Sequence, residues 1–170
     1  METQSSIALW GRETFGTYSA LTMASRMNVE TAELVSILTH QPDNWEEITA
    51  EQRALITEEL ADVFIVLVQV MEIRKRQDWQ PKALVRNQFR YPHTLAADIA
   101  LWSAQLIYEM RLSASTDGFA ACHTAANLLG CLQAACACLD ADLQQAVDAK
   151  MTINRSRQWR RTEAGRHQHA

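Results

Sequence analysis

The chain has 170 residues, a length that suits one domain, and its 48% apolar and 21% charged residues exclude a disordered or fibrous protein. Only 5 residues are Gly and 3 are Pro, so turns are scarce and an all-helical fold is expected. The same scarcity excludes the glycine-rich phosphate loops, because no G-x-G-x-x-G or Walker A pattern occurs. The formal net charge of −4 is unevenly distributed, since acids concentrate between residues 29 and 62 and bases between residues 150 and 166. The first stretch should attract cations and the second anions.

We predict an all-α bundle of five to six helices in a single domain over residues 1–161, with a flexible tail over residues 162–170. Apolar periodicity predicts a first helix over 18–40, and the capping pair Thr49 and Gln52 opens a second helix that runs to about residue 76. A strand over the β-branched run 63–66 is the alternative, but the absence of Gly and Pro favours a helix. A connector is expected over 77–93. Further helices are expected over 96–112, over 119–139, and from a cap at Asp142 to about residue 161.

An internal duplication is also possible, because residues 49–76 resemble residues 117–139 in their pattern. This alignment places Asp62 opposite Asn127 and Glu59 opposite Thr124, so the second copy would have lost its carboxylates.

A cytoplasmic location is expected. Residues 1–16 lack the basic and apolar regions of a signal peptide, and the longest apolar run, 63–68, is far shorter than the roughly 20 residues that cross a bilayer. The cysteines lie in one Ala- and Leu-rich segment (Cys122, Cys131, Cys136 and Cys138). Cys136 and Cys138 are two residues apart on a helix and point to nearly opposite sides, so they are not expected to share a metal there. The cysteines are predicted to fill the core in a reducing compartment.

Two carboxylate pairs have helical spacing: Glu30 with Glu33, and Glu59 with Asp62. Such pairs usually form a solvated face, but here both fall within the apolar stripes of consecutive helices that we expect to be antiparallel. Because buried ionised carboxylates are costly without counter-charge, a divalent cation is the economical partner. Ligands that are all oxygen favour Mg²⁺, with Mn²⁺ as the alternative. A di-iron centre is not expected, because no Glu has a His three residues later.

The last helix carries Lys150, Asn154 and Arg157 at steps of four and three residues, hence on one face. They could bind phosphate or form a solvated basic surface. Three aromatic residues precede the first carboxylate pair and could stack on a nucleobase or belong to the core: Trp10, Phe15 and Tyr18. Trp45 could cover the site or anchor its loop.

The segments NVETAELVSILTHQ, ITEELADVFIVLVQV and LDADLQQAVDAKMTINRSRQW resemble the all-α nucleoside triphosphate pyrophosphohydrolases of the MazG and dimeric dUTPase superfamily. The resemblance covers roughly half of the chain, and the segment between residues 76 and 139 resembles the longer, duplicated members. It implies Mg²⁺ ligands (Glu30, Glu33, Glu59 and Asp62), catalytic roles for Glu33 and Glu59, and phosphate contacts from Lys150 and Asn154, with Arg157 fitting by its spacing. It also implies a four-helix core, and cleavage of a nucleoside triphosphate into a monophosphate and pyrophosphate by a homodimer or homotetramer.

Two alternatives stay open at this point. The chain could be a non-catalytic helical interaction or oligomerisation protein, or an enzyme similar to phosphoribosyl-ATP pyrophosphatase. Partners among nucleic acids and membranes are not expected, since the net charge is acidic and the basic helix offers only Trp159 for stacking.

Overall fold

The fold is an all-α bundle, as predicted. The computed structural model describes residues 1–17, 19–73, 89, 91–112, 119–161 and 167–169. Six α-helices lie within these residues: α1 (Gln4–Phe15), α2 (Ala20–Thr39), α3 (Ala50–Ile73), α4 (Pro92–Leu112), α5 (Phe119–Leu139) and α6 (Leu143–Ser156). A 3₁₀ turn, η1 (Trp45–Glu47), precedes α3, and the short strands β1 (Trp159–Arg161) and β2 (His167–His169) follow α6.

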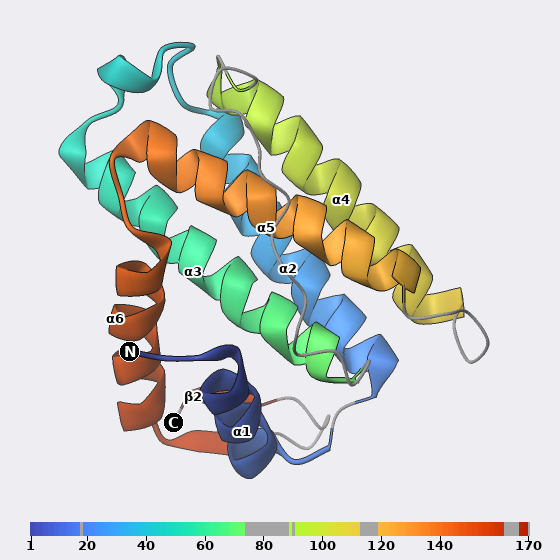
Figure 1. The fold of residues 1–170 in the computed structure, drawn as a ribbon. Coiled ribbons are helices and arrows are strands. Elements are labelled where there is room, and N and C mark those ends of the chain that lie inside the picture. The colour runs from blue at the N-terminus through green and yellow to red at the C-terminus, as the bar shows by residue number, and fades with distance from the viewer. Residues whose placement is uncertain (18, 74–88, 90, 113–118, 162–166, 170) are drawn as a thin grey trace.

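The central helices α2 to α5 pack along one another, and α6 and α1 pack against one side of α3 (Figure 1). α2 contacts α3 and α4, while α5 contacts α3 and α4, so two consecutive helical pairs share one core. That core is a single cluster of buried side chains, and α3 is buried nearly all round from Leu60 to Met71. The N-terminal residues lie beside α6, where Arg155 Nε donates to Glu2 Oε1 over 2.9 Å (Figure 1).

Local capping explains where several helices begin. The predicted pair before α3 is confirmed, since Thr49 N donates to Gln52 Oε1 and Gln52 N donates to Thr49 Oγ1. The Asp142 carboxylate accepts from the backbone N–H groups of the first turn of α6, as expected for its N-cap. α4 begins at Pro92, earlier than the predicted residue 96, because proline is well suited to the first position of a helix. α1, which was not predicted, opens with a capping box between Thr3 and Ser6.

The end of the last helix differs from the prediction. α6 stops at Ser156 instead of continuing to residue 161, and β1 pairs antiparallel with β2. The cause is Trp159, whose Nε1 donates to the Asn154 carbonyl over 3.0 Å and whose ring packs edge-on against Phe15 at 5.0 Å. Residues 167–169 were predicted to belong to a flexible tail, but they form β2 and pair with β1. Residues 162–166 and 170 lie outside the described part of the chain.

The cysteines fill the core, as predicted. All four are free thiols, and Cys131, Cys136 and Cys138 are buried. Burial raises the pKa of Cys131 and of Cys136 to about 12, so these thiols are inert at neutral pH. The stretch Ala121–Leu139 of α5 is long and apolar enough to cross a bilayer, but 72% of it is buried inside the bundle, as in the core helix of a soluble protein.

Trp45 anchors the loop between α2 and α3. Its ring is buried, and its Nε1 donates to the carbonyl of Phe89 over 3.1 Å. Arg53 holds the same loop, because its guanidinium donates to three backbone carbonyls: those of Ile48, Leu139 and Trp45.

We expect Arg53→Met to lower the free energy of unfolding by about 2–3 kcal/mol, because it keeps the aliphatic stem and leaves three carbonyls without their charged donor. Urea denaturation followed by circular dichroism measures the change. The exposed Arg111→Met is the matched control and should stay within about 0.5 kcal/mol of the wild type. An Arg53→Met protein as stable as that control would contradict the prediction.

Candidate metal centre

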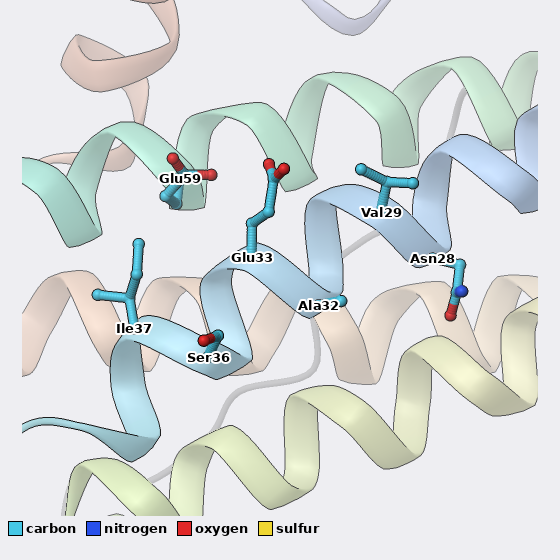
Figure 2. Close-up of a pocket in the computed structure, with 7 residues that line it drawn as sticks. All are labelled: Asn28, Val29, Ala32, Glu33, Ser36, Ile37 and Glu59. Atoms are coloured by element: carbon cyan, nitrogen blue, oxygen red, sulfur yellow. The ribbon is translucent and has the colours of Figure 1, made fainter.

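Three of the four predicted carboxylate ligands meet between α2 and α3. Glu30 and Glu33 come from α2 and Glu59 from α3, and one oxygen atom of each lies within 4.8 Å of the others. Helical spacing places the two α2 carboxylates on one face, and the packing of α2 against α3 brings that face to Glu59. Figure 2 shows the Glu33 side chain pointing from α2 toward α3, the helix that carries Glu59.

The cluster borders an open groove of about 560 Å³ along α2. Glu33 and Glu59 form its acidic part, and the remaining lining side chains are small, apolar or uncharged: Asn28, Val29, Ala32, Ser36 and Ile37 (Figure 2). A groove of this volume is within the range that accommodates a small organic ligand. The carboxylates are therefore reachable from solvent on this side.

Burial and neighbouring negative charges raise the pKa values of two carboxylates in the cluster. Burial, then the charges of Asp62 and Glu33, raise the pKa of Glu59 to about 7. Burial and the charge of Asp62 also raise the pKa of Glu30. Glu59 Oε2 is buried and has no hydrogen-bond partner within the described part of the chain. An all-oxygen site with an excess of negative charge and an unsatisfied buried oxygen fits a hard divalent cation.

The fourth predicted ligand, Asp62, lies next to this set and is paired with α6. Lys150 Nζ is 2.6 Å from Asp62 Oδ2 and 2.7 Å from Glu58 Oε1. Burial raises the pKa of Asp62, and the hydrogen bond from Lys150 opposes that rise. The pKa of Lys150 itself is raised, because its hydrogen bonds to Asp62 and Glu58 outweigh the effect of burial. Asp62 is thus not part of the three-carboxylate set and forms an ion pair beside it, and its role as a metal ligand stays a prediction.

The predicted basic set lies on the same side of α3 as Asp62. Lys150 and Asn154 are buried, and Arg157 Nη1 donates to Asn154 Oδ1 over 3.1 Å. The Arg157 charge also opposes the raised pKa of Asp62. This face of α6 is therefore not a solvated basic surface.

Two of the three aromatic residues form a packed cluster with Trp159. Trp10 is buried, and its ring centroid lies 5.2 Å from that of Phe15 and 6.2 Å from that of Trp159. All three pairs meet edge-on, so Trp10 belongs to the core, and no open slot for a base is formed between these rings. Tyr18 lies outside the described residues.

Two residues near the site were not singled out from the sequence. Glu58 shares Lys150 with Asp62, and Arg26 opposes the raised pKa of Glu30 while lying over the Phe15 ring at 5.5 Å. Arg26 is four residues before Glu30, so helical spacing could have identified it. The pairing of Glu58 with Lys150 joins residues 92 positions apart and leaves no local signal.

In the second helical pair, the side chains at the positions that align with Glu59 and Asp62 form hydrogen bonds within that pair. Thr124 Oγ1 donates to Glu109 Oε1 over 3.0 Å, and the buried Asn127 donates to the carbonyl of His123. The internal duplication stays a prediction.

Comparison of the chain with protein-family models, curated proteins and solved structures gives no significant match.

The carboxylate cluster predicts a pH-dependent stability for the metal-free protein. Because the folded-state pKa of Glu59 is raised from 4.5 to about 7, its contribution is present below pH 4.5 and is lost as the pH rises through about 7. After allowance for solvent screening, we expect a loss on the order of 1–2 kcal/mol from this residue between pH 5 and pH 8. The melting temperature in EDTA should fall over this range, and excess Mg²⁺ or Mn²⁺ should remove the fall. A metal-free melting temperature that is constant or rises would contradict the prediction.

Proposed function

We propose that this protein is a divalent-cation-dependent nucleoside triphosphate pyrophosphohydrolase. The observation that carries the proposal is the convergence of the Glu30, Glu33 and Glu59 carboxylates within 4.8 Å, next to a buried lysine on α6. Such a site offers cation ligands and a phosphate-binding charge side by side, which is the combination that phosphoanhydride cleavage needs. The sequence resemblance to the all-α pyrophosphohydrolases supports the same reaction.

Glu30, Glu33 and Glu59 would hold Mg²⁺ or Mn²⁺, with Asp62 as a further ligand or as a charge beside them. The cation would supply charge neutralisation on the triphosphate and a lower pKa for a bound water. Glu33 is exposed at the groove, where it can orient a water molecule or accept its proton, and Glu59 is the second candidate for this role. Water would form a bond to a phosphorus of the α–β anhydride, the anhydride P–O bond would break, and the proton of the water would pass to the carboxylate. The products would be a nucleoside monophosphate and pyrophosphate.

The phosphates would be bound from the α6 side. Lys150 already holds two carboxylates, so binding a phosphate requires that it exchange one of them. Glu58 is the partner to exchange, because 51% of its side chain is exposed, against 18% for Asp62. Asn154 and Arg157 extend the same face and would complete the anion-binding set.

The test is the release of pyrophosphate from a panel of ribo- and deoxyribonucleoside triphosphates and from phosphoribosyl-ATP, with and without Mg²⁺ or Mn²⁺. Cation-dependent release together with equimolar monophosphate supports the proposal, and the preferred substrate separates housecleaning of the nucleotide pool from the phosphoribosyl-ATP reaction. Failure to release pyrophosphate from any of these compounds would sink the catalytic proposal.

A second candidate, a helical interaction or oligomerisation protein, is favoured by one observation. Along α4, three large apolar side chains are about 50–60% exposed: Leu101 (59%), Tyr108 (58%) and Leu112 (53%). Their spacing of seven and four residues places them on one face of the helix. A homodimer or homotetramer would bury such a face in either candidate function, and light scattering after size-exclusion chromatography measures the oligomeric state.

A further inference from the structure

The groove along α2 extends beyond the carboxylates that border it. Its volume is about 560 Å³, while a divalent cation would fill only the space beside Glu33 and Glu59. None of the other described residues that line the groove is charged, and their side chains are small, apolar or neutral and polar. Ligand pockets of this composition bind uncharged groups, so the groove suits the nucleoside part of a nucleotide better than its phosphates.

The basic groups lie on a different side of the carboxylates. Lys150 contacts Asp62, which follows Glu59 by three residues on α3. No residue of α6 is among the described residues that line the groove. Phosphates that reach Lys150 would therefore leave the groove along α2 for the rest of the substrate.

The lining side chains follow one another along α2 in a definite order (Figure 2). Glu33 and Glu59 lie toward one side of the groove, and Asn28 lies at the far end from Glu59. Val29 and Ala32 lie between Glu33 and Asn28. Helix positions 28 and 33 are separated by about 7.5 Å along the axis. The groove thus presents carboxylates first, then a small apolar surface, and then an amide.

The residues of this stretch are exposed. Val29 is 52% exposed, and Asn28 and Ala32 are exposed as well. The Asn28 amide therefore offers a donor and an acceptor to a ligand in the groove. Because these three side chains lie outside the buried core, they can be changed with little effect on stability.

We propose that the nucleoside of the substrate lies in this groove, with its phosphates at Glu33 and Glu59 and its base at Asn28. This inference rests on the proposed function and adds a nucleoside subsite and a specificity-determining residue to it. The sugar would contact Val29 and Ala32, which are small enough to leave room for it. The Asn28 amide would pair with a neighbouring donor and acceptor on the edge of the base.

The first test is Ala32→Leu, which places a larger side chain in the middle of the groove. The probes are four nucleoside monophosphates (AMP, GMP, CMP and UMP) and pyrophosphate, each titrated calorimetrically in the presence of Mg²⁺. We expect the variant to bind the monophosphates at least about tenfold more weakly, because the groove is filled. Its affinity for pyrophosphate should stay within about twofold of the wild type, because pyrophosphate does not enter that part of the groove.

Ala54→Leu is the matched control for this test. Ala54 is an exposed alanine of α3 that is not among the residues lining the groove, so the same substitution there should leave both affinities unchanged. Binding of no monophosphate by the wild type, or an unchanged monophosphate affinity in Ala32→Leu, would overturn the inference. An equal loss of monophosphate and pyrophosphate affinity would also overturn it, since the substitution would then act on the carboxylates.

The second test is Asn28→Leu, a variant of similar size without the amide. We expect the wild type and Ala54→Leu to prefer one of the four bases, and Asn28→Leu to lose about three- to tenfold of that preference. A wild type that binds the four bases equally, or an unchanged preference in Asn28→Leu, would overturn the role of Asn28. Binding is read without turnover, so a protein that binds monophosphates in the groove but releases no pyrophosphate would refute the proposed hydrolysis and support this inference.

Discussion

Glu59→Gln is expected to weaken Mn²⁺ and Mg²⁺ binding by about a hundredfold or more and to remove pyrophosphohydrolase activity. The size of the effect follows from the loss of a direct ligand, since the loss of mere outer-shell groups at metal sites already costs about 10–100-fold. Glu59 is the α3 member of the cluster and carries the buried oxygen that has no partner among the described residues. Isothermal titration with Mn²⁺ and a pyrophosphate-release assay measure the two effects.

The stability of this variant separates loss of a ligand from misfolding. A neutral amide at position 59 removes the carboxylate whose pKa is raised to about 7, so the metal-free protein at pH 8 should gain on the order of 1–2 kcal/mol. Glu51→Gln is the matched control on the same helix, because Glu51 is exposed and lies in the first turn of α3. It should leave cation binding and activity unchanged. Normal Mn²⁺ affinity in Glu59→Gln would contradict the assignment of the site.

The sequence predicts the α2–α3 part of the site well, because the evidence there is local. Glu30 lies between buried Met27 and Leu34 on α2, and Glu33 follows it at helical spacing. The capping pair Thr49 and Gln52 defines the start of the next helix. Two consecutive amphipathic helices with a short loop pack against each other, so the meeting of Glu33 with Glu59 follows from periodicity and connection length alone.

The other half of the site depends on contacts between distant parts of the chain. Lys150 reaches Asp62 only because α6 packs on α3, so the sequence could place Lys150 on the anion-binding face but could not identify its carboxylate partners. The end of α6 at Ser156 also involves a distant contact, because Trp159, which follows it, packs against Trp10 of α1. α1 itself was missed because its apolar stripe is short.

The positive charges that oppose the acids lie outside the acidic stretch of the sequence, residues 29–62. From the sequence, Arg53 is the only base within residues 29–62, but its guanidinium is committed to backbone carbonyls. The charges that do oppose the acids come from Lys150, Arg26 and Arg157, which lie outside that stretch. They compensate Asp62 better than Glu59, which is why the cation-binding end of the site is the end left with excess negative charge.

Lys150→Met is the second large expected effect, and it tests which role the lysine has. Removing the ammonium leaves the half-buried Asp62 without its counter-ion, so the free energy of unfolding at pH 8 should fall by about 2–4 kcal/mol. The loss should be smaller at pH 5, because an unpaired Asp62 can then take up a proton. Urea denaturation at the two pH values measures the difference, and equal losses would indicate that the lysine stem, through packing, accounts for the effect.

The double variant Lys150→Met with Asp62→Asn separates stability from substrate binding. Replacing both partners removes the uncompensated charge, so most of the lost stability should return. Activity should not return, because the double variant still lacks the ammonium that is proposed to bind phosphate, and Asp62 beside the cluster is neutral. If activity returned with stability, Lys150 would serve only to neutralise Asp62, and the phosphates would have to be bound by Asn154 and Arg157 alone. If neither returned, the pairing of Lys150 with Glu58 would be the contact that holds α6 on α3.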